Sequence, residues 1–97
     1  MNCAILEVVS SLAETLGMQQ KTEEQIQEDE SVAGLFNRLS AKYPRFSQMV
    51  FDVREQKILD DGVLIFFNGM ELSLKKGVNT KLNNGDVLTI VPLVRGG

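Results

Sequence analysis

Two apolar runs near the ends of the chain predict two strands inside a sheet. Residues 3–9 (CAILEVV) form one run and residues 87–91 (VLTIV) the other, and both are rich in β-branched residues. Short runs that are apolar at odd and even positions are typical of strands covered on both faces. We therefore expect two central strands that lie side by side. A long connection separates them, so they can run in parallel.

Two helices are predicted from apolar residues that recur three and four positions apart. The first covers residues 10–16, and Gly17 fits the position that ends it. The second begins after Ser31, a favourable N-cap residue, and ends at Tyr43 because the residue before Pro44 avoids the α region. Its apolar face consists of Val32, Leu35, Phe36 and Leu39.

A hairpin is predicted around Asn68-Gly69, which separates the apolar residues 63–67 from residues 70–74. A two-residue type I′ turn needs positive φ at both positions, and Asn-Gly supplies it. The polar residues 19–26 fit an exposed second strand that pairs with the first one. Residues 46–61 give no pattern that we can assign, apart from a turn at Asp60-Asp61-Gly62.

The predicted order is therefore strand, polar strand, helix, hairpin and final strand. One main helix, residues 31–43, lies across a mixed sheet of four or five strands, which is an α+β arrangement of the β-grasp type. Seven apolar residues should lie in the core: Ile5, Val32, Leu35, Leu39, Ile65, Leu88 and Ile90. Gly34 lowers the helix propensity, and we interpret it as a point of close packing against the sheet.

Composition excludes several classes of protein. Ninety-seven residues form one domain, and 13 acids against 10 bases give a net charge of −3, so a nucleic-acid partner is not expected. Without histidine and with one cysteine, the chain lacks the usual residues of a zinc site, a histidine base or a disulfide framework. It has no long apolar run and no signal-peptide pattern at its start, so we expect a cytoplasmic protein with no membrane partner.

Several polar groups have a simpler interpretation than chemistry. The acidic residues 23–30 are interpreted as a solvated loop that places negative charge before a helix N-terminus, in preference to an acidic docking surface. Cys3 is interpreted as a buried structural thiol, and Asp60 and Asp61 as turn residues. The remaining cluster, interpreted as a solvated face, is Lys75, Lys76 and Lys81.

The last residues are the best candidate for chemistry. We divide the chain into a domain of residues 1–92 and a tail of residues 93–97, with Pro92 at the end of the final strand. A Gly-Gly end leaves a carboxylate with no Cβ beside it, on a segment that can thread a narrow channel. Gly97 is therefore the predicted site of covalent change. The tail that presents it, which we expect to be mobile in the free protein, consists of Leu93, Val94, Arg95 and Gly96.

Three segments, residues 63–69, 82–87 and 91–97, resemble the C-terminal half of the ubiquitin-like sulfur-carrier family. That family includes the small subunit of molybdopterin synthase, the thiazole and cysteine sulfur carriers, and archaeal ubiquitin-like modifiers. The extra residues 50–61 make this chain more similar to the molybdopterin and archaeal branches. Two positions depart from the family pattern: Leu93 replaces a second proline, and Arg95 replaces a small residue.

The resemblance implies a carrier rather than an enzyme, with no bound cofactor or metal. A ubiquitin-activating-enzyme-like adenylyltransferase would use ATP to adenylate the Gly97 carboxylate, and a sulfurtransferase would supply the sulfur for a thiocarboxylate. The preferred destination is molybdopterin biosynthesis, with the large subunit of molybdopterin synthase as partner. One alternative is a protein modifier that forms isopeptide bonds to lysines through Gly97. Another is a sulfur carrier for thiazole synthesis, cysteine synthesis or tRNA thiolation. A third is a non-covalent β-grasp interaction domain. An apolar patch of Val9, Val91 and Pro92 is the expected contact with the activating enzyme.

Overall fold

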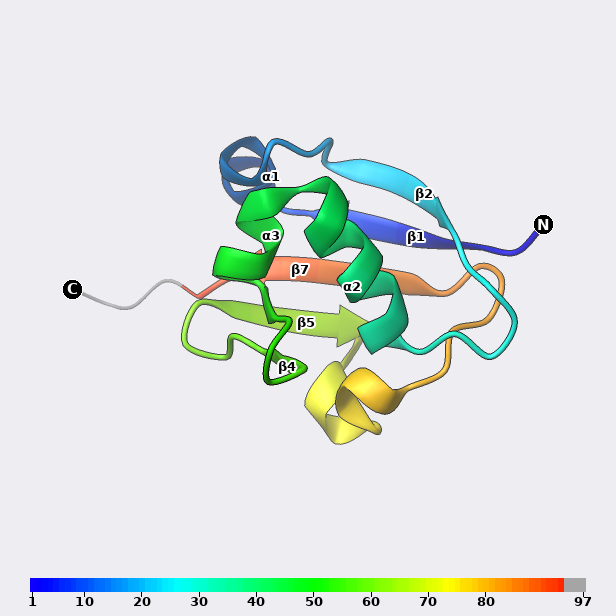
Figure 1. The fold of residues 1–97 in the computed structure, drawn as a ribbon. Coiled ribbons are helices and arrows are strands. Elements are labelled where there is room, and N and C mark those ends of the chain that lie inside the picture. The colour runs from blue at the N-terminus through cyan, green and yellow to red at the C-terminus, as the bar shows by residue number, and fades with distance from the viewer. Residues whose placement is uncertain (94–97) are drawn as a thin grey trace.

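The computed structural model describes residues 1–93 and contains a five-stranded mixed sheet with helices across it (Figure 1). The sheet order is β2-β1-β7-β5-β6. Its strands are β1 (Cys3–Val8), β2 (Lys21–Gln25), β5 (Val63–Phe67), β6 (Met70–Glu71) and β7 (Val87–Pro92). The other elements are α1 (Ser10–Leu16), α2 (Val32–Lys42), α3 (Pro44–Met49), the strand pair β3 (Phe51–Asp52) and β4 (Lys57–Ile58), and the 3-10 helices η1 (Leu72–Leu74) and η2 (Gly77–Asn79). This is the predicted α+β, β-grasp fold.

The first and last strands are neighbours and run in parallel, as the apolar runs predict. β1 pairs with β7 from Ile5↔Val87 to Val8↔Ile90, and β7 is the middle strand of the sheet. β2 is the polar second strand, antiparallel to β1. Neither long strand forms an edge, so both are protected from unwanted pairing.

The burial of β1 and β7 corrects one expectation. Each strand alternates between fully and partly buried residues, so only one face of the sheet is covered. Ile5 is therefore half-buried and not part of the core, because its neighbours Ala4 and Leu6 point to the covered face. The other six predicted core residues are buried: Val32, Leu35, Leu39, Ile65, Leu88 and Ile90.

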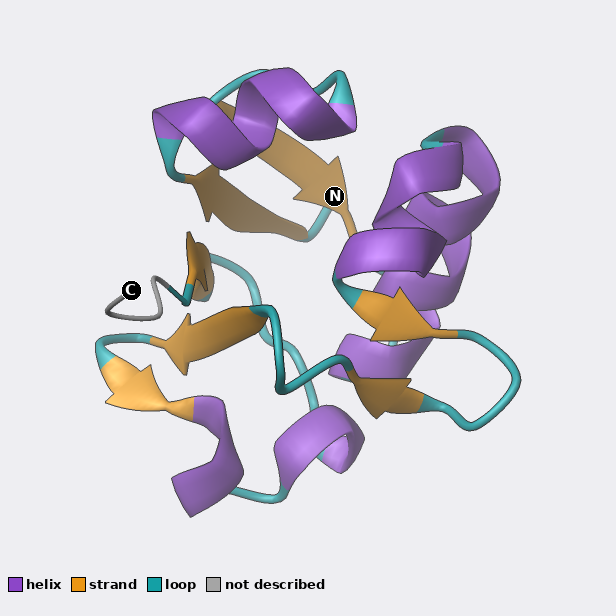
Figure 2. Ribbon diagram, turned by 90° about the vertical axis from the view of Figure 1, so that its left-hand side faces the viewer, coloured by secondary structure: helices purple, strands orange, loops and turns teal. Residues whose placement is uncertain are grey.

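The unassigned region completes the core beneath α2. Pro44 is the first residue of α3, where a proline costs no backbone hydrogen bond. Phe46 of α3 and Phe51 of β3 pack edge-on against Phe36 of α2, with ring centroids 5.1 and 5.7 Å apart. All three rings are fully buried. Figure 2 shows α2 and α3 together on one side of the sheet.

The predicted turn at Asn68-Gly69 is present, but the hairpin is shorter than expected. Asn68 and Gly69 have φ of 50° and 84°, as a type I′ turn requires. The second strand, β6, contains only two residues, and the chain then enters η1. Leu72 is buried by this turn of the chain, which leaves part of β5 without a neighbour on that side.

The start of α2 forms as predicted, although Gly34 has a different role. Ser31 caps the helix, its Oγ accepting from the N–H of Gly34 at 3.2 Å. A Cβ at position 34 would lie 2.9 Å from Cγ of Glu30. Gly34 therefore gives room to the acidic loop, not to the sheet.

Candidate functional site

The C-terminal end of β7 is anchored to the start of β5, on the side of the molecule opposite to the N-terminus (Figure 1). Pro92 pairs with Val63, and the N–H of Leu93 donates to the carbonyl of Gly62 at 2.9 Å. Of the five predicted tail residues, Leu93 thus continues the ladder. Val94, Arg95, Gly96 and Gly97 lie outside the described residues.

The three residues of the predicted contact patch lie at this end of the sheet but not on one face. Val91 pairs with Leu64 on the face turned away from α2, whereas Pro92 pairs with the buried Val63 on the covered face. The N–H of Val9 donates to the carbonyl of Ile90 at 3.2 Å, which places Val9 beside the last residues of β7. Val9 is 38% exposed, and Val91 and Pro92 are half-buried. Val9 and Val91 are therefore accessible next to the point where the tail begins, and Pro92 is not part of the same surface.

The patch continues into a larger apolar surface that the sequence analysis did not identify. Cross-strand partners share a face, and the register joins Ile5 to Val87 and Leu64 to Val91. Each of these side chains is half-buried, on the face turned away from α2. We call this surface the open face; it comprises Ile5, Leu64, Phe66, Val87 and Val91. The alternation of side chains along each strand predicts these five residues on one face, but only once the register of the strands is known.

One polar pair crosses the open face. The hydroxyl of Thr89 on β7 donates to Oε1 of Glu7 on β1 at 3.3 Å. These residues are also directly paired across the two parallel strands. This polar contact lies within the apolar surface, which adjoins the start of the tail.

Comparison with known proteins identifies the family of this chain. The model of the ThiS family matches residues 6–97. The chain belongs to the ThiS family. Its members are ubiquitin-like sulfur carriers and modifiers, which are small carrier proteins rather than catalysts. A search of curated protein sequences finds no match.

Solved structures agree with the fold of this ThiS-family chain. SAMP1 from Haloferax volcanii is 21% identical with a TM-score of 0.76, over 99% of this chain and 100% of that one. A chain in the BexX/CysO complex of Amycolatopsis orientalis is 19% identical with a TM-score of 0.74, over 97% and 99%. A candidate molybdopterin converting factor subunit 1 from Pyrococcus furiosus is 19% identical with a TM-score of 0.73, over 97% and 100%. At these identities the likeness establishes the fold.

The acidic loop of this ThiS-family chain forms a structural ion pair. Nη2 and Nε of Arg38 donate to the Glu30 carboxylate, at 2.6 and 3.0 Å, and the N–H of Gln27 donates to it at 3.0 Å. Burial acts to raise the pKa of Glu30, but these hydrogen bonds outweigh it and hold the pKa below its usual value. The bond to Glu30 raises the pKa of Arg38. The pair lies beside Gln25, at the end of β2 that is remote from Val9.

The other candidate groups form no joint site. Cys3 is half-buried, not buried as expected, because it faces the same side of β1 as Ile5. Lys81 Nζ donates to the carbonyl of Asp29 at 2.9 Å, which ties two loops together. Among residues 1–93, no cluster of three or more cysteine, aspartate or glutamate side chains has the arrangement of a metal site. Nor does that part of the chain contain a helix long and apolar enough to cross a membrane.

Proposed function

We propose that this ThiS-family protein is a sulfur carrier whose reacting group is the carboxylate of Gly97. The observation that carries the proposal is the family match, which runs to residue 97 through the β7 strand that precedes the tail. Leu93 makes a backbone contact with Gly62, just before β5, and residues 94–97 follow it. The chain itself supplies the group that reacts and no catalytic machinery.

The chemistry begins with activation, because a carboxylate is a poor electrophile. An oxygen of the Gly97 carboxylate attacks the α-phosphorus of ATP in the partner enzyme, and pyrophosphate leaves. Hydrosulfide then attacks the carbonyl carbon of this mixed anhydride and AMP leaves, so that a thiocarboxylate forms. If a persulfide attacks instead, the product is an acyl disulfide, and a second thiol must reduce its S–S bond to release the thiocarboxylate.

The open face, which includes Val91, and the adjoining Val9 are the proposed docking surface for the adenylating enzyme. They adjoin the start of the tail, so an enzyme bound there has residues 94–97 within reach. Exposed apolar surface of this kind is typical of protein contacts. The polar Thr89–Glu7 pair gives such a contact a fixed register.

Molybdopterin biosynthesis is the proposed destination of the sulfur. The structural likeness to the candidate molybdopterin converting factor subunit supports it. Conjugation of Gly97 to lysine amines is the second candidate, because SAMP1, a small archaeal modifier protein, is equally similar in fold. Both functions require the same adenylate.

Intact mass spectrometry tests the carrier function directly. The full-length protein is incubated with the adenylating enzyme of its own cell, ATP and sulfide. We expect the mass to rise by the difference between a sulfur and an oxygen atom, and deletion of Gly97 to abolish the rise. Gly96→Ala adds a methyl group to the segment that must enter the enzyme, so its conversion should fall sharply.

Gly62→Ala is the matched control for the added methyl group. A Cβ at position 62 would meet its nearest atom, the carbonyl oxygen of Met49, at 3.7 Å, which is an ordinary contact. This variant should react like the parent protein although Gly62 bonds to Leu93. If a chain without Gly96 and Gly97 still supports the parent function in cells, the carrier proposal is wrong and an interaction domain replaces it. Lysine conjugates carrying Gly97, found without any thiocarboxylate, would favour the modifier function.

A further inference from the structure

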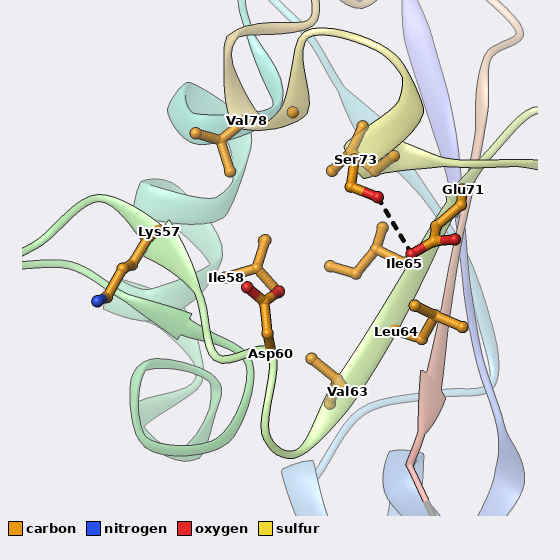
Figure 3. Close-up of a pocket in the computed structure, with 11 residues that line it drawn as sticks. Lys57, Ile58, Asp60, Val63, Leu64, Ile65, Glu71, Ser73 and Val78 are labelled. Carbon is orange, nitrogen blue, oxygen red and sulfur yellow. Dashed lines mark hydrogen bonds between the residues drawn. The ribbon is translucent and has the colours of Figure 1, made fainter.

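The 3-10 helices η1 and η2 contribute to two hollows with different chemistry. The first is a cavity of about 210 Å³, whose lining includes Ser73 of η1, Val78 of η2 and residues of β5 (Figure 3). Leu64 belongs both to this cavity and to the open face, and Val63 in its wall pairs with Pro92. The cavity is therefore part of the region around the start of the tail and not a separate site.

The second hollow is open to solvent and basic, and we call it the basic hollow. It measures about 630 Å³, and its lining includes Lys75, Lys76 and Lys81. None of its eight lining residues is acidic. The sequence between Glu71 and Asp86 contains these three lysines and no acid, although the whole chain has a net charge of −3. Positive charge is thus concentrated at one place on a negatively charged protein.

The charges of the basic hollow are not neutralised by the described part of the chain. The one ion pair of residues 1–93 lies elsewhere, on α2 and the acidic loop. Lys81 Nζ donates to the backbone carbonyl of Asp29, which leaves two of its three N–H groups for another acceptor. The carboxylate of Asp86 already accepts from the amide of Asn68 and from the N–H of Asn83. The hollow therefore attracts an anionic group from outside the chain.

An exposed leucine lies at the same place. Leu74 is 72% exposed, more than any other large apolar residue among residues 1–93 except Met1. It lines the basic hollow together with Phe67, which is buried. Covering Leu74 with another apolar side chain is favourable, because its surface leaves water. The basic hollow thus combines an apolar contact with three positive charges.

The basic hollow lies away from the tail and the open face. Asn83 in its lining precedes β7, whereas the tail follows β7, and a strand of six residues spans roughly 20 Å. Phe67 points to the covered face of the sheet, as Val63 and Ile65 do. Figure 1 shows η1 and η2, in yellow, at the lower side of the molecule and the C-terminus at the left. A partner bound here leaves the open face accessible to the adenylating enzyme.

We propose that the basic hollow is a docking site for an acidic segment of a partner protein that carries one apolar side chain. The apolar side chain packs on Leu74 and Phe67, and the carboxylates accept hydrogen bonds from the three lysine ammonium groups. Complementary charge selects this segment over a basic one. A second copy of this surface is a poor occupant, because it brings three further lysines. Exposed ion pairs are weak and screened by salt, so the binding is weak and depends on salt.

Peptide titration followed by NMR tests the basic hollow. The probe is the blocked peptide acetyl-Asp-Glu-Leu-Glu-Asp-amide, which is added to the ¹⁵N-labelled full chain at low salt. We expect the amide resonances of Leu74, Lys76 and Lys81 to shift along one common binding curve. An increase of the salt concentration by about tenfold should weaken the binding several-fold.

Two further peptides and an oligonucleotide provide the matched controls. Acetyl-Asp-Glu-Ser-Glu-Asp-amide keeps the charge without the apolar side chain, and acetyl-Asn-Gln-Leu-Gln-Asn-amide keeps the leucine without the charge. Both should bind several-fold more weakly than the probe. Equal binding of the serine peptide would reduce the contact to general charge attraction and overturn the proposal. A thymidine pentanucleotide without terminal phosphates has the same net charge as the probe, and tighter binding of it would assign the surface to nucleic acid instead.

Paired charge variants locate the binding. Lys75→Gln combined with Lys76→Gln should weaken the binding of the probe several-fold. Lys21→Gln combined with Lys42→Gln changes the net charge by the same amount at exposed positions of β2 and α2, and it should bind like the parent. Equal losses in the two double variants would mean that overall charge attracts the peptide, and the proposal would be wrong.

The apolar contact has its own pair of variants. Leu74→Ser should weaken the binding several-fold, whereas Val53→Ser, at another exposed apolar position, should leave it unchanged. Binding should also survive deletion of Gly96 and Gly97, so the result is independent of the proposed carrier function. An excess of peptide that leaves the Leu74 amide unmoved, or that shifts Val91 of the open face instead, would contradict the proposal.

Discussion

The two faces of the central sheet are built from the same strands, yet one is packed and the other is available. On the covered face, Leu6, Leu88 and Ile90 are at most 1% exposed beneath α2. On the open face, their sequence neighbours Ile5, Val87 and Val91 are half-buried and turned away from α2. The covered face stabilises the fold, whereas the open face leaves apolar area for a contact with another protein.

Because of this difference, adjacent residues of one strand have different roles: one stabilises the fold and the next is available for contact with a partner. Substitutions one position apart along β1 or β7 change opposite faces. Pairs of adjacent variants therefore measure the contribution of each face within one strand, with the same backbone and the same ladder. The predictions below use such pairs where the chain offers them.

The largest loss of stability is expected when a charge is placed on the covered face of β7, and a matched charge on its open face should have a much smaller effect. Ile90→Asp would bury an unpaired carboxylate at a fully buried position, which should lower the unfolding free energy by more than about 4 kcal/mol and leave little folded protein. Val91→Asp should cost about 1 kcal/mol, because its carboxylate remains hydrated. Chemical denaturation with far-UV circular dichroism measures both.

Activation distinguishes the two faces further. Val91→Asp and Val9→Asp should be folded but adenylated more slowly, since they place a charge in the proposed docking surface. Adenylation of both variants at the parent rate would remove this patch from the interface. Val91→Asp as destabilising as Ile90→Asp would contradict the distinction between the faces.

A smaller effect is expected from truncation on β1. Leu6→Ala should cost about 2–5 kcal/mol, as for other buried leucines, because it leaves a cavity under α2. Ile5→Ala should cost about 1 kcal/mol, since half of this side chain contacts water in the folded protein. Equal losses in denaturant titrations would mean that the open face is as well packed as the covered one.

The smallest effect is expected at the Glu30–Arg38 pair, which lies outside both faces. Glu30→Gln should lower the unfolding free energy by about 1 kcal/mol at pH 7, because a bidentate pair is among the stronger surface ion pairs. The pKa of Glu30 is lowered in the folded protein, so the carboxylate stabilises the fold above its unfolded pKa. This contribution is lost as the pH falls through the lowered folded pKa. Denaturation at pH 7 and at pH 3 should therefore show the gap between parent and variant closing in acid.

The sequence predicts the order of the sheet better than its faces. Apolar runs locate β1 and β7 and indicate their parallel pairing. Because both the odd-numbered and the even-numbered residues of these runs are apolar, the sequence does not reveal which set faces α2. For this reason Ile5 was assigned to the core when Leu6 belongs there. The register with β2 does not settle this, because Ala4 and Ile5 both pair with a glutamate; the observed burial of Ala4, Leu6 and Val8 does.

The middle of the chain shows why local pattern has limits. Phe46 and Phe51 are fully buried against Phe36, yet each belongs to a short element whose apolar face is defined only by that distant ring. The cavity at the edge of β5 could not be predicted from the sequence for the same reason, since residues of four elements line it. The Gly-Gly tail needed no tertiary information to be recognised. Its reactivity remains a prediction, because residues 94–97 lie outside the described structure.

The pairing of the first strand with the last also governs how the protein is made. β1 precedes its parallel partner, β7, by about 80 residues in the sequence, so β1 is synthesised well before β7. Such distant pairing requires the closure of a very large loop and slows folding. A chain that lacks β7 lacks the middle strand of the sheet. The tail follows β7 directly. Completion of the sheet and synthesis of the residues that the proposed function needs are therefore close together in time.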